Sequence, residues 1–221
     1  RWLFGNKEYD NGNVYLLNNA IDLDKFKYDE KLRKEKRKEL NIKEDTLVIG
    51  HVGRFNLQKN HLRLIDIFRQ VVLKNSDAML LLIGEGELES EAKTKVSQYG
   101  IDSNVLFLGL RSDVADLYQA MDVFVMPSLF EGLPVVGIEA QASGLECVYS
   151  DKVTKEARIL QNSEFVSLKT DDSEWADILL KHNKASLDRE RAFELVRDAG
   201  YDISIEAKKL EGIYQNMCEE V

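Results

Sequence analysis

The sequence contains little proline and little cysteine, and it has no long apolar run. Only two of its 221 residues are proline and two are cysteine. The longest apolar run, Ala78 to Ile83, is far shorter than the roughly 20 residues of a membrane-spanning helix. A hydrophobic fraction of 44% excludes disordered and collagen-like chains. The composition therefore predicts a globular protein without stable membrane insertion.

Basic residues are outnumbered by acidic ones. The chain has 30 lysines and arginines against 39 acidic residues, a net charge of −9, which argues against a broad nucleic-acid surface but permits a local basic pocket. Cys147 and Cys218 are two thiols in a chain too large to need a disulfide, so we expect a reducing compartment, the cytoplasm. No signal peptide is visible, and the first residue is Arg1 rather than Met. We therefore expect the chain to be part of a longer protein.

Short apolar segments alternate with amphipathic segments of helical length. The apolar segments predict six strands, at residues 47–53, 78–84, 105–109, 123–127, 147–150 and 165–168. Strands that are apolar throughout and separated by helices are typical of a parallel sheet covered on both faces. The sequence therefore predicts an α/β fold with a doubly wound, six-stranded Rossmann-like sheet. Within it, we expect Ser112 to cap a short helix and Pro134 to lie in the first turn of another.

The two ends of the chain follow different patterns. Val14 to Leu17 reads as one possible strand. The charged run from Lys31 to Lys38 has two interpretations: a solvated helix face, which we favour, or a surface that contacts anionic lipid. A third segment, Ile203 to Glu220, carries an apolar stripe at helical spacing.

Candidate ligand-binding residues follow the predicted strands, because ligands bind outside the carboxyl ends of an open parallel sheet. Arg54 and Lys59 lie on a loop that starts at Gly53, and both could face one anion. Gly132 would let backbone approach a ligand, and the helix at Pro134 would offer free N–H groups and a positive dipole end. Two cations and a helix N-terminus around one crevice suit a diphosphate.

Two acids, Glu131 and Glu139, flank the start of that helix. Glu139 lies on an apolar stretch, where it could accept hydrogen bonds from ribose hydroxyls or face water. A nicotinamide-dependent dehydrogenase is disfavoured because the G-x-G-x-x-G spacing is absent, and no P-loop lysine is present. The three histidines and two cysteines show no metal-ligand spacing, so we expect no metal site.

An ordered set of motifs across residues 46–150 resembles a known family. The set consists of Gly53-Arg54 with Gln58-Lys59-Asn60, Leu82-Ile83-Gly84-Glu85-Gly86, Phe107-Leu108-Gly109, Asp122 to Ser128, and Glu131-Gly132-Leu133-Pro134 followed by Glu139 to Gly144. It is similar to the nucleotide-sugar domain of retaining GT-B glycosyltransferases of the "group 1" family, such as those that build bacterial exopolysaccharides and capsules. One half of a GT-B fold is the architecture that this resemblance implies.

The resemblance also implies roles for individual residues. Arg54, Lys59 and Glu131 would be the catalytic set, with the two cations holding the donor diphosphate and stabilising the leaving nucleoside diphosphate. Glu139 would bind the ribose hydroxyls. The full set expected to contact the nucleotide sugar is Gly53, Gly84, Leu110, Arg111, Gly132, Leu133, Pro134, Val135 and Glu139. The implied donor is a nucleoside-diphosphate sugar, a UDP-sugar in preference to a GDP-sugar, bound without a metal or other cofactor.

The domain organisation expected from the resemblance has three parts. Residues 1–45 would form an interdomain crossover and linker helix, and residues 46–202 the donor-binding domain. Residues 203–221 would form a helix that packs on an N-terminal acceptor domain missing from this chain. The expected function is transfer of a sugar to a saccharide or lipid-linked acceptor, with possible peripheral membrane contact of the full-length protein. The alternative is a non-catalytic nucleotide-sugar sensor or regulatory subunit of the same fold.

Overall fold

A six-stranded parallel sheet forms the centre of the protein. The computed structural model describes residues 3, 5–11, 14–182 and 189–219. The strand order is β3-β2-β1-β4-β5-β6, and every pairing is parallel. The strands are β1 (Val48–Val52), β2 (Met79–Ile83), β3 (Val105–Gly109), β4 (Val123–Met126), β5 (Glu146–Ser150) and β6 (Glu164–Val166). The predicted doubly wound, six-stranded sheet is confirmed.

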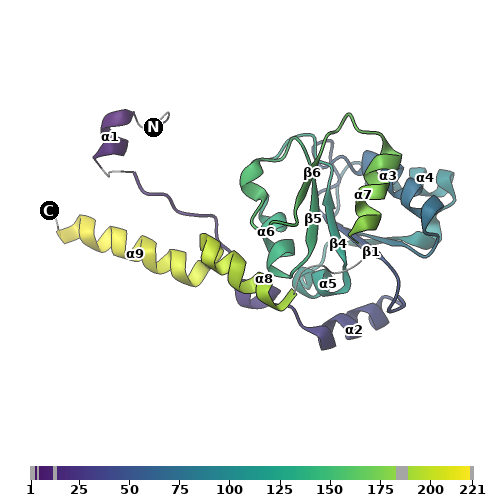
Figure 1. Ribbon diagram of the computed structural model, residues 1–221, viewed down its shortest axis with the longest axis horizontal. Helices are drawn as coiled ribbons and strands as arrows, with labels where there is room; N and C mark the ends of the chain where they lie inside the picture. The colour runs from purple at the N-terminus through teal and green to yellow at the C-terminus, as the bar shows by residue number, and fades with distance from the viewer. Residues whose placement is uncertain (1–2, 4, 12–13, 183–188, 220–221) are drawn as a thin grey trace.

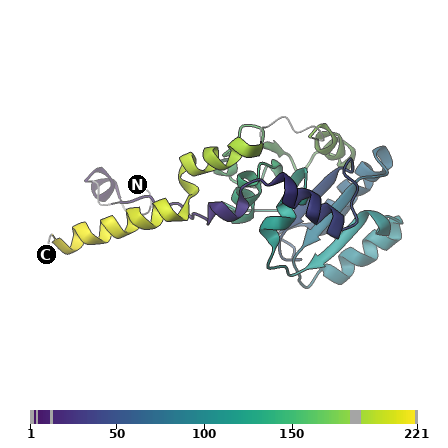
Figure 2. The same cartoon turned by 90° about the horizontal axis from the view of Figure 1, so that it is seen from below.

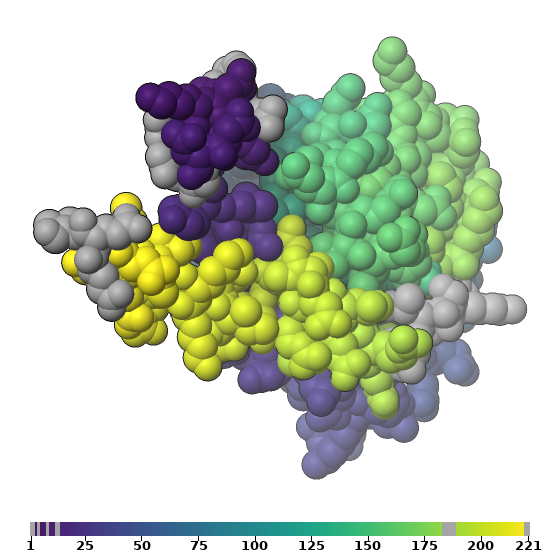
Figure 3. Space-filling model, turned by 60° about the vertical axis from the view of Figure 1, so that its left-hand side comes forward, coloured from purple at the N-terminus to yellow at the C-terminus, as the bar shows by residue number. Residues whose placement is uncertain are grey.

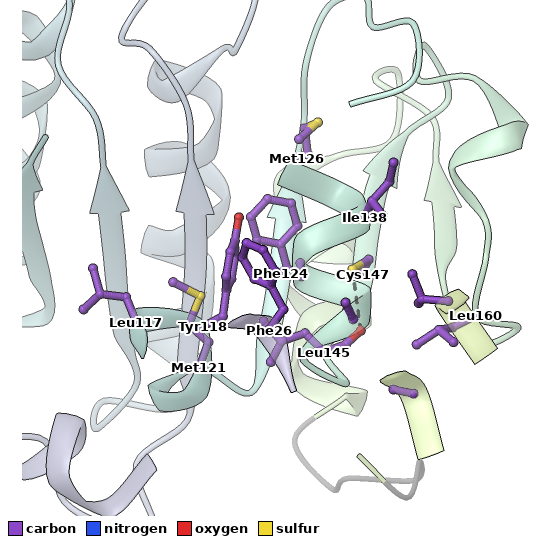
Figure 4. Packing of buried hydrophobic residues seen from close by; sticks show 14 of the residues in the cluster. Phe26, Leu117, Tyr118, Met121, Phe124, Met126, Ile138, Leu145, Cys147 and Leu160 are labelled. Atoms are coloured by element: carbon purple, nitrogen blue, oxygen red, sulfur yellow. Dashed lines mark hydrogen bonds between the residues drawn. The ribbon is translucent and has the colours of Figure 1, made fainter. Parts of the chain in front are cut away.

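Helices cover both faces of this sheet (Figure 1). One face packs against α3 (His61–Lys74), α4 (Glu89–Tyr99) and α7 (Asp172–Lys181), and the other against α5 (Val114–Ala120) and α6 (Val135–Ala142). The side chains of β4 show the alternation: Phe124 and Met126 belong to the core on the α5–α6 side, shown in Figure 4, whereas Val123 and Val125 belong to the opposite core. Burial on both faces is why each strand is apolar at every position.

The chain changes direction in the sheet between β1 and β4. It runs outward from β1 through β2 to β3, then returns to place β4 against the other side of β1. At such a switch point the helices that follow the two central strands, here α3 and α6, lie on opposite faces of the sheet, and a crevice opens at the carboxyl ends of the strands. Because β1 and β4 are paired, the loops that follow them lie next to each other.

The predicted charged helix is present as α2 (Glu30–Glu39), which packs against α5. Arg37 is only 3% exposed. Its guanidinium group donates to the backbone oxygens of Lys43, Glu44, Thr46 and Ala120 and to the Asp122 carboxylate at 2.7 Å. Arg33 contacts the other oxygen of Asp122 at 2.5 Å. The prediction of a solvated face is therefore wrong for these two arginines, because Asp122 draws them onto the domain; Lys31, Lys34 and Lys38 are exposed.

Two smaller expectations are also wrong. Residues 14–17 form no strand and pair with none of the six strands; the nearest β-bridge joins Ile21 to Asp202. Helix α5 begins after Asp113 rather than after Ser112. Asp113 makes no side-chain cap, since its carboxylate is taken by Arg111 and Lys36.

The C-terminal part of the chain extends away from the sheet. After α8 (Arg189–Val196) and a single π-helical turn (Arg197–Tyr201), α9 (Ile203–Glu219) projects outward (Figure 2). Figure 3 shows the purple N-terminal segment beside it, and Lys209 of α9 donates to the backbone oxygen of Leu16. Residues 220–221 of the predicted helix lie outside the described residues.

The remaining short elements are α1 (Asn6–Asp10) and the 3-10 turns Leu23–Phe26, Asp102–Asn104 and Lys155–Ala157. Leu23 and Phe26 are buried in the core on the α5–α6 side, so this segment is packed onto the sheet domain. None of the helices formed by the described residues has the length and apolar character required to cross a membrane.

The buried arginine on α2 generates a stability prediction. Arg37→Ala is expected to lower the free energy of unfolding by about 3 kcal/mol, because it removes one partner of a buried ion pair and leaves several carbonyl oxygens without their donor. Urea unfolding followed by circular dichroism measures the change. Lys38→Ala, at the next and exposed position of the same helix, is the matched control and should change stability by less than about 0.5 kcal/mol. Equal effects of the two substitutions would contradict the structural role of Arg37.

Candidate functional site

A cavity of about 570 Å³ opens where β1, β2 and β3 end. Five residues of the predicted site line it: Gly53, Arg54, Gly84, Leu110 and Arg111. The other lining residues are Val52, Ile83, Glu85, Gly86 and Val114. Most of the wall is backbone or apolar side chain, with Arg54, Glu85 and Arg111 as its charged members. The cavity thus offers apolar surface for a flat ring and a few charged groups at its border.

Close backbone contact between two loops shapes this cavity. Gly84 has φ +131°, and a Cβ atom there would lie 2.2 Å from the backbone oxygen of Gly53. The amide of Gly53 donates to the backbone oxygen of Ile83 at 2.9 Å, which fixes the approach. Only glycine combines this φ with so close a contact. Gly84 therefore has a structural reason to be present that is independent of any ligand.

Lys59 and Glu131 form an ion pair across the crevice. The Lys59 Nζ atom lies 2.6 Å from Glu131 Oε1, and the two side chains are 16% and 9% exposed. A Cβ atom on Gly53 would lie 3.2 Å from the Cδ and Cε atoms of Lys59, so the lysine stem runs alongside the start of the cavity wall. The pair joins the loop after β1 to the loop after β4, and it places a positive and a negative group together at the mouth of the crevice.

Hydrogen bonds tie the same two loops along their length. Leu129 donates its amide to the backbone oxygen of Gln58 at 2.8 Å, and the Gln58 amide side chain donates to the backbone oxygen of Phe130 at 3.1 Å. Asn60, in the left-handed conformation, donates to the backbone oxygen of Pro127 at 3.0 Å. Because the loops are held together, the position of Glu131 is set by the β1 loop as well as by its own strand.

The predicted backbone contacts lie at the start of α6. Gly132 is exposed, Leu133 and Val135 are partly buried, and Pro134 is the N-cap residue, one position before the first helical turn. No side chain caps this end of the helix. The first turn of α6 therefore begins four residues after Glu131, and no side chain among the described residues accepts a hydrogen bond from its amides.

The two candidate cations have separate carboxylate partners. Arg54, with a side chain that is 72% exposed, lies 3.4 Å from Glu87, whereas Lys59 is paired with Glu131. Arg111 is held differently, because its Nε and Nη2 atoms both lie 2.7 Å from oxygens of Asp113. These hydrogen bonds hold the pKa of Asp113 well below its usual range. Arg111 is thus fixed in a bidentate pair at the cavity border. Arg54 makes only a long, exposed ion pair with Glu87, which it could give up to bind a ligand.

Glu139 lies on α6 with its carboxylate against a buried tyrosine. The hydroxyl of Tyr118 on α5 lies 3.0 Å from Glu139 Oε2 and 3.2 Å from the backbone oxygen of Val136. Burial raises the pKa of the Glu139 carboxyl, and the hydrogen bond from Tyr118 opposes this shift. Glu139 is partly exposed, although Ile138 and Ala140 beside it are buried. The alternative that Glu139 simply faces water is therefore wrong for one of its oxygens.

Two buried imidazoles lie behind the β1 loop. His51 Nδ1 is 2.7 Å from the backbone oxygen of Val125, and His61 stacks on Phe55 with ring centroids 3.9 Å apart. The two imidazole rings meet edge to face at 4.7 Å. Burial lowers the pKa of His51 to about 4 and that of His61 to about 2, so both rings are neutral near pH 7. Among the described residues, no group of three or more His, Cys, Asp or Glu side chains could hold a metal ion.

Comparison with known proteins identifies the family. The model of the family "Glycosyl transferases group 1" matches residues 33–199, most of the chain and all of the elements that form the site. The chain belongs to this family. The resemblance noted from the motifs is confirmed, and it extends beyond residues 46–150 to include α2 and α7.

Curated relatives of this group 1 chain include longer proteins. It is 36% identical over 222 residues to the putative glycosyltransferase EpsF of Bacillus subtilis, with 100% of this chain and 58% of EpsF covered. It is 33% identical over 141 residues to the UDP-Gal:alpha-D-GlcNAc-diphosphoundecaprenol alpha-1,3-galactosyltransferase of Escherichia coli, covering 62% of this chain and 36% of that protein. The chain therefore spans about half the length, or less, of these relatives.

Solved structures support the same fold. The crystal structure of Anabaena HepE in complex with UDP and glucose matches with a TM-score of 0.76 at 20% identity, covering 90% of this chain and 56% of HepE. The C-terminal domain of the group 1 protein LpcC from Francisella tularensis matches with a TM-score of 0.69 at 24% identity, covering 83% of this chain and all of that domain. These two likenesses show that the chain has the same fold as the matched parts of both structures.

Sequence reasoning missed several residues of the group 1 site. Val52 and Val114 line the cavity but are ordinary apolar residues in the sequence, and nothing separates them from core positions. Tyr118 reads as part of an apolar helical stripe, although its hydroxyl meets Glu139. Asn60, which ties the two loops, was noted only as part of a motif. For Val52 and Asn60 the available signal was position, because Val52 ends β1 and Asn60 lies in the loop that follows it.

The buried imidazoles generate a prediction for acid stability. Unfolded histidines titrate near pH 6.5, whereas His51 and His61 do so at about 4 and about 2 in the folded protein. Between the folded and the unfolded pKa values the unfolded state binds more protons. The contribution of the two rings to the free energy of unfolding is therefore present above pH 6.5 and is lost as the pH falls toward 4. We expect the free energy of unfolding to drop by about 4 kcal/mol from pH 6.5 to pH 4.5, measured by urea unfolding.

Substitution at His61 separates this effect from general acid denaturation. His61→Phe keeps the stack on Phe55 and should remove about half of the acid-dependent loss. His182→Gln is the control: its hydrogen bond to Glu146 raises the pKa of His182, so that contribution is complete below pH 6.5 and is lost only as the pH rises through the folded pKa. The same acid slope in His61→Phe and in the unaltered protein would contradict the assignment.

Proposed function

We propose that this chain is the donor-binding part of a retaining glycosyltransferase that acts in the synthesis of bacterial surface polysaccharide. It would transfer a sugar from a nucleoside-diphosphate sugar to a saccharide or lipid-linked acceptor. The observation that carries the proposal is that the loop after β1 lines the cavity through Gly53 and Arg54 and also carries Lys59, which pairs with Glu131 of the loop after β4. The cavity suits a base, and the crevice suits a charged diphosphate with its sugar.

The chemistry follows from where charge develops. As the bond between the sugar and the diphosphate breaks, negative charge accumulates on the leaving nucleoside diphosphate. Lys59 and Arg54 would stabilise that charge, and the first-turn amides of α6 would add partial positive charge. Glu131 holds the Lys59 ammonium group at the crevice, where a phosphate oxygen would compete with Glu131 for it. These side-chain cations take the place that a metal ion would have, and donor binding is proposed to be metal-independent.

Different parts of the donor would contact different parts of the site. Glu131 would contact the sugar once the diphosphate has drawn Lys59 away from it. Glu139 would accept from the ribose hydroxyls, and the border of Leu110 and Arg111 would lie beside the base. We favour a UDP-sugar over a GDP-sugar. Supporting this choice, the Anabaena neighbour was solved with UDP and the E. coli relative is named for UDP-Gal.

The upstream half of a longer protein would complete the enzyme. Helix α9 exposes Ile203, Ile205, Tyr214 and Met217. A groove of about 570 Å³ along the helix is lined by Ala207, Leu210 and Tyr214 together with Glu211, Gln215 and Cys218. Exposed apolar surface of this kind suits a protein partner. We propose that α9 packs on an N-terminal acceptor domain, with residues 1–45 as the crossover. The free thiols of Cys147 and Cys218 favour a cytoplasmic location, with any membrane contact made by the full-length protein at its inner face.

Calorimetric titration with UDP, GDP and ADP, each with and without magnesium, tests nucleotide binding. We expect UDP to bind most tightly and magnesium to have no effect. Lys59→Ala should weaken UDP binding about 10- to 100-fold, because a hydrogen bond between charged groups is lost and Glu131 is left to repel the diphosphate.

Lys74→Ala is the matched control for this variant. Lys74 also forms an ion pair at 2.6 Å, with Asp177, but lies at the end of α3 away from the crevice. It should leave the dissociation constant for UDP unchanged. Equal affinity of Lys59→Ala and the unaltered protein would refute the phosphate role, and binding of none of the three nucleotides would refute the proposed function.

A second measurement concerns turnover. The chain of 221 residues is expected to bind the donor nucleotide but to transfer no sugar, because the acceptor side of the cleft belongs to the proposed upstream half. Release of UDP from UDP-sugars in the presence of saccharide acceptors measures this directly. Sustained, acceptor-dependent release of UDP by the chain alone would contradict the proposal that the acceptor site belongs to the upstream half.

A further inference from the structure

A buried tyrosine links the cavity wall to the candidate ribose-binding acid. Tyr118 lies one helical turn after Val114, which lines the cavity, so the two side chains share a face of α5. Tyr118 is fully buried, and its hydroxyl lies 3.0 Å from Glu139 Oε2. Among the described residues, no other side chain or amide donates to the Glu139 carboxylate. One oxygen of Glu139 is thus held from inside the protein, and Oε1 is left for a donor from outside.

The ring of Tyr118 is itself fixed by packing. Its centroid lies 6.0 Å from that of Phe124 on β4 and 6.0 Å from that of Phe26, and Figure 4 shows these rings close together. The backbone oxygen of Tyr118 accepts a hydrogen bond from Arg189. With the ring and the main chain both held, the hydroxyl has one position, and so does the carboxylate oxygen that it contacts.

Burial and the Tyr118 hydroxyl act on the Glu139 carboxyl in opposite directions. Burial raises the pKa of its carboxyl, and the Tyr118 hydroxyl lowers it. An ionised carboxylate with one anchored oxygen can accept hydrogen bonds from two neighbouring hydroxyl groups on its open side, which a protonated or freely rotating carboxyl does less well. Adjacent hydroxyls of this kind are the 2′ and 3′ groups of ribose.

We propose that Tyr118 is a positioning residue that makes the donor pocket prefer ribonucleoside diphosphates over 2′-deoxyribonucleoside diphosphates, by holding Glu139 in the orientation that accepts from the ribose hydroxyl pair. This inference rests on the proposed nucleotide-sugar function. It extends that function by assigning sugar selectivity to a side chain that does not touch the ligand.

The experiment compares UDP with 2′-deoxy-UDP by calorimetry on the unaltered protein and on Tyr118→Phe. The unaltered protein should bind UDP about tenfold more tightly than 2′-deoxy-UDP, since the deoxy compound lacks one hydroxyl that donates to a charged acceptor. Tyr118→Phe should weaken UDP binding about tenfold and leave the binding of 2′-deoxy-UDP within about twofold, so that the preference largely disappears.

Tyr149→Phe is the matched control. Tyr149 is equally buried in the same core, and its hydroxyl contacts Gly137 and Gln141 rather than Glu139. It should leave both dissociation constants and their ratio unchanged. Thermal unfolding of the two variants measures any general loss of stability, which a purely structural role of Tyr118 would show without a change in the ratio.

The outcomes separate the inference from the function on which it rests. Loss of UDP and 2′-deoxy-UDP binding by the same factor in Tyr118→Phe, or no loss of either, would overturn the positioning role while the proposed function stands. If the unaltered protein binds no nucleoside diphosphate, both are overturned. Should Tyr118→Phe not fold, 3-fluorotyrosine at position 118 replaces it: its fluorine resonance should shift with UDP, shift less with 2′-deoxy-UDP, and stay unchanged with UDP in Glu139→Gln. Equal shifts for the two nucleotides would overturn the inference.

Discussion

Coverage of the parallel sheet on both faces is the constraint on which the rest of this structure depends. Because helices bury the two faces, the strands are apolar throughout and only the ends of the sheet are open to a ligand. The return of the chain from β3 to β4 then decides where along the carboxyl edge the crevice lies, since α3 and α6, which follow β1 and β4, cover opposite faces of the sheet. Residues as distant in sequence as Lys59 and Glu131 meet for this reason alone.

Opposite charges are matched inside the domain before any ligand binds. At the amino ends of the strands, Asp122 gathers two arginines of α2 and fastens that helix to α5. At the carboxyl ends, Lys59 is matched by Glu131 and Arg111 by Asp113. The first set serves stability. In the second set, Arg111 lines the cavity and Lys59 lies on the loop that starts at its wall; these ion pairs hold the side chains in place, and a phosphate is proposed to compete for the lysine.

The region behind the site is apolar or neutral, and this strengthens the electrostatic interactions of the charged groups in front of it. His51 and His61 are buried as neutral rings beside the β1 loop, and the hydroxyl of the buried Tyr118 contacts Glu139 and the backbone oxygen of Val136. Surroundings of this kind strengthen each remaining electrostatic interaction, because little solvent is present to screen it. Helix α9 is the opposite case: Ile203, Ile205, Tyr214 and Met217 are exposed on it, which is why a further domain is proposed to cover them.

The sequence by itself determined the strands, the parallel sheet and the family, because apolar periodicity and short motifs at strand ends are local properties. It also placed Gly53, Arg54, Gly84, Leu110 and Arg111 at one edge, and all five line one cavity. Only the tertiary structure decided the rest. In it, Arg33 and Arg37 of the charged run form ion pairs with Asp122, residues 14–17 have no strand partner, and the Tyr118 hydroxyl contacts Glu139. Those outcomes depend on contacts between segments 18 to 89 positions apart, or on the lack of a neighbouring edge, and no local pattern in the chain records them.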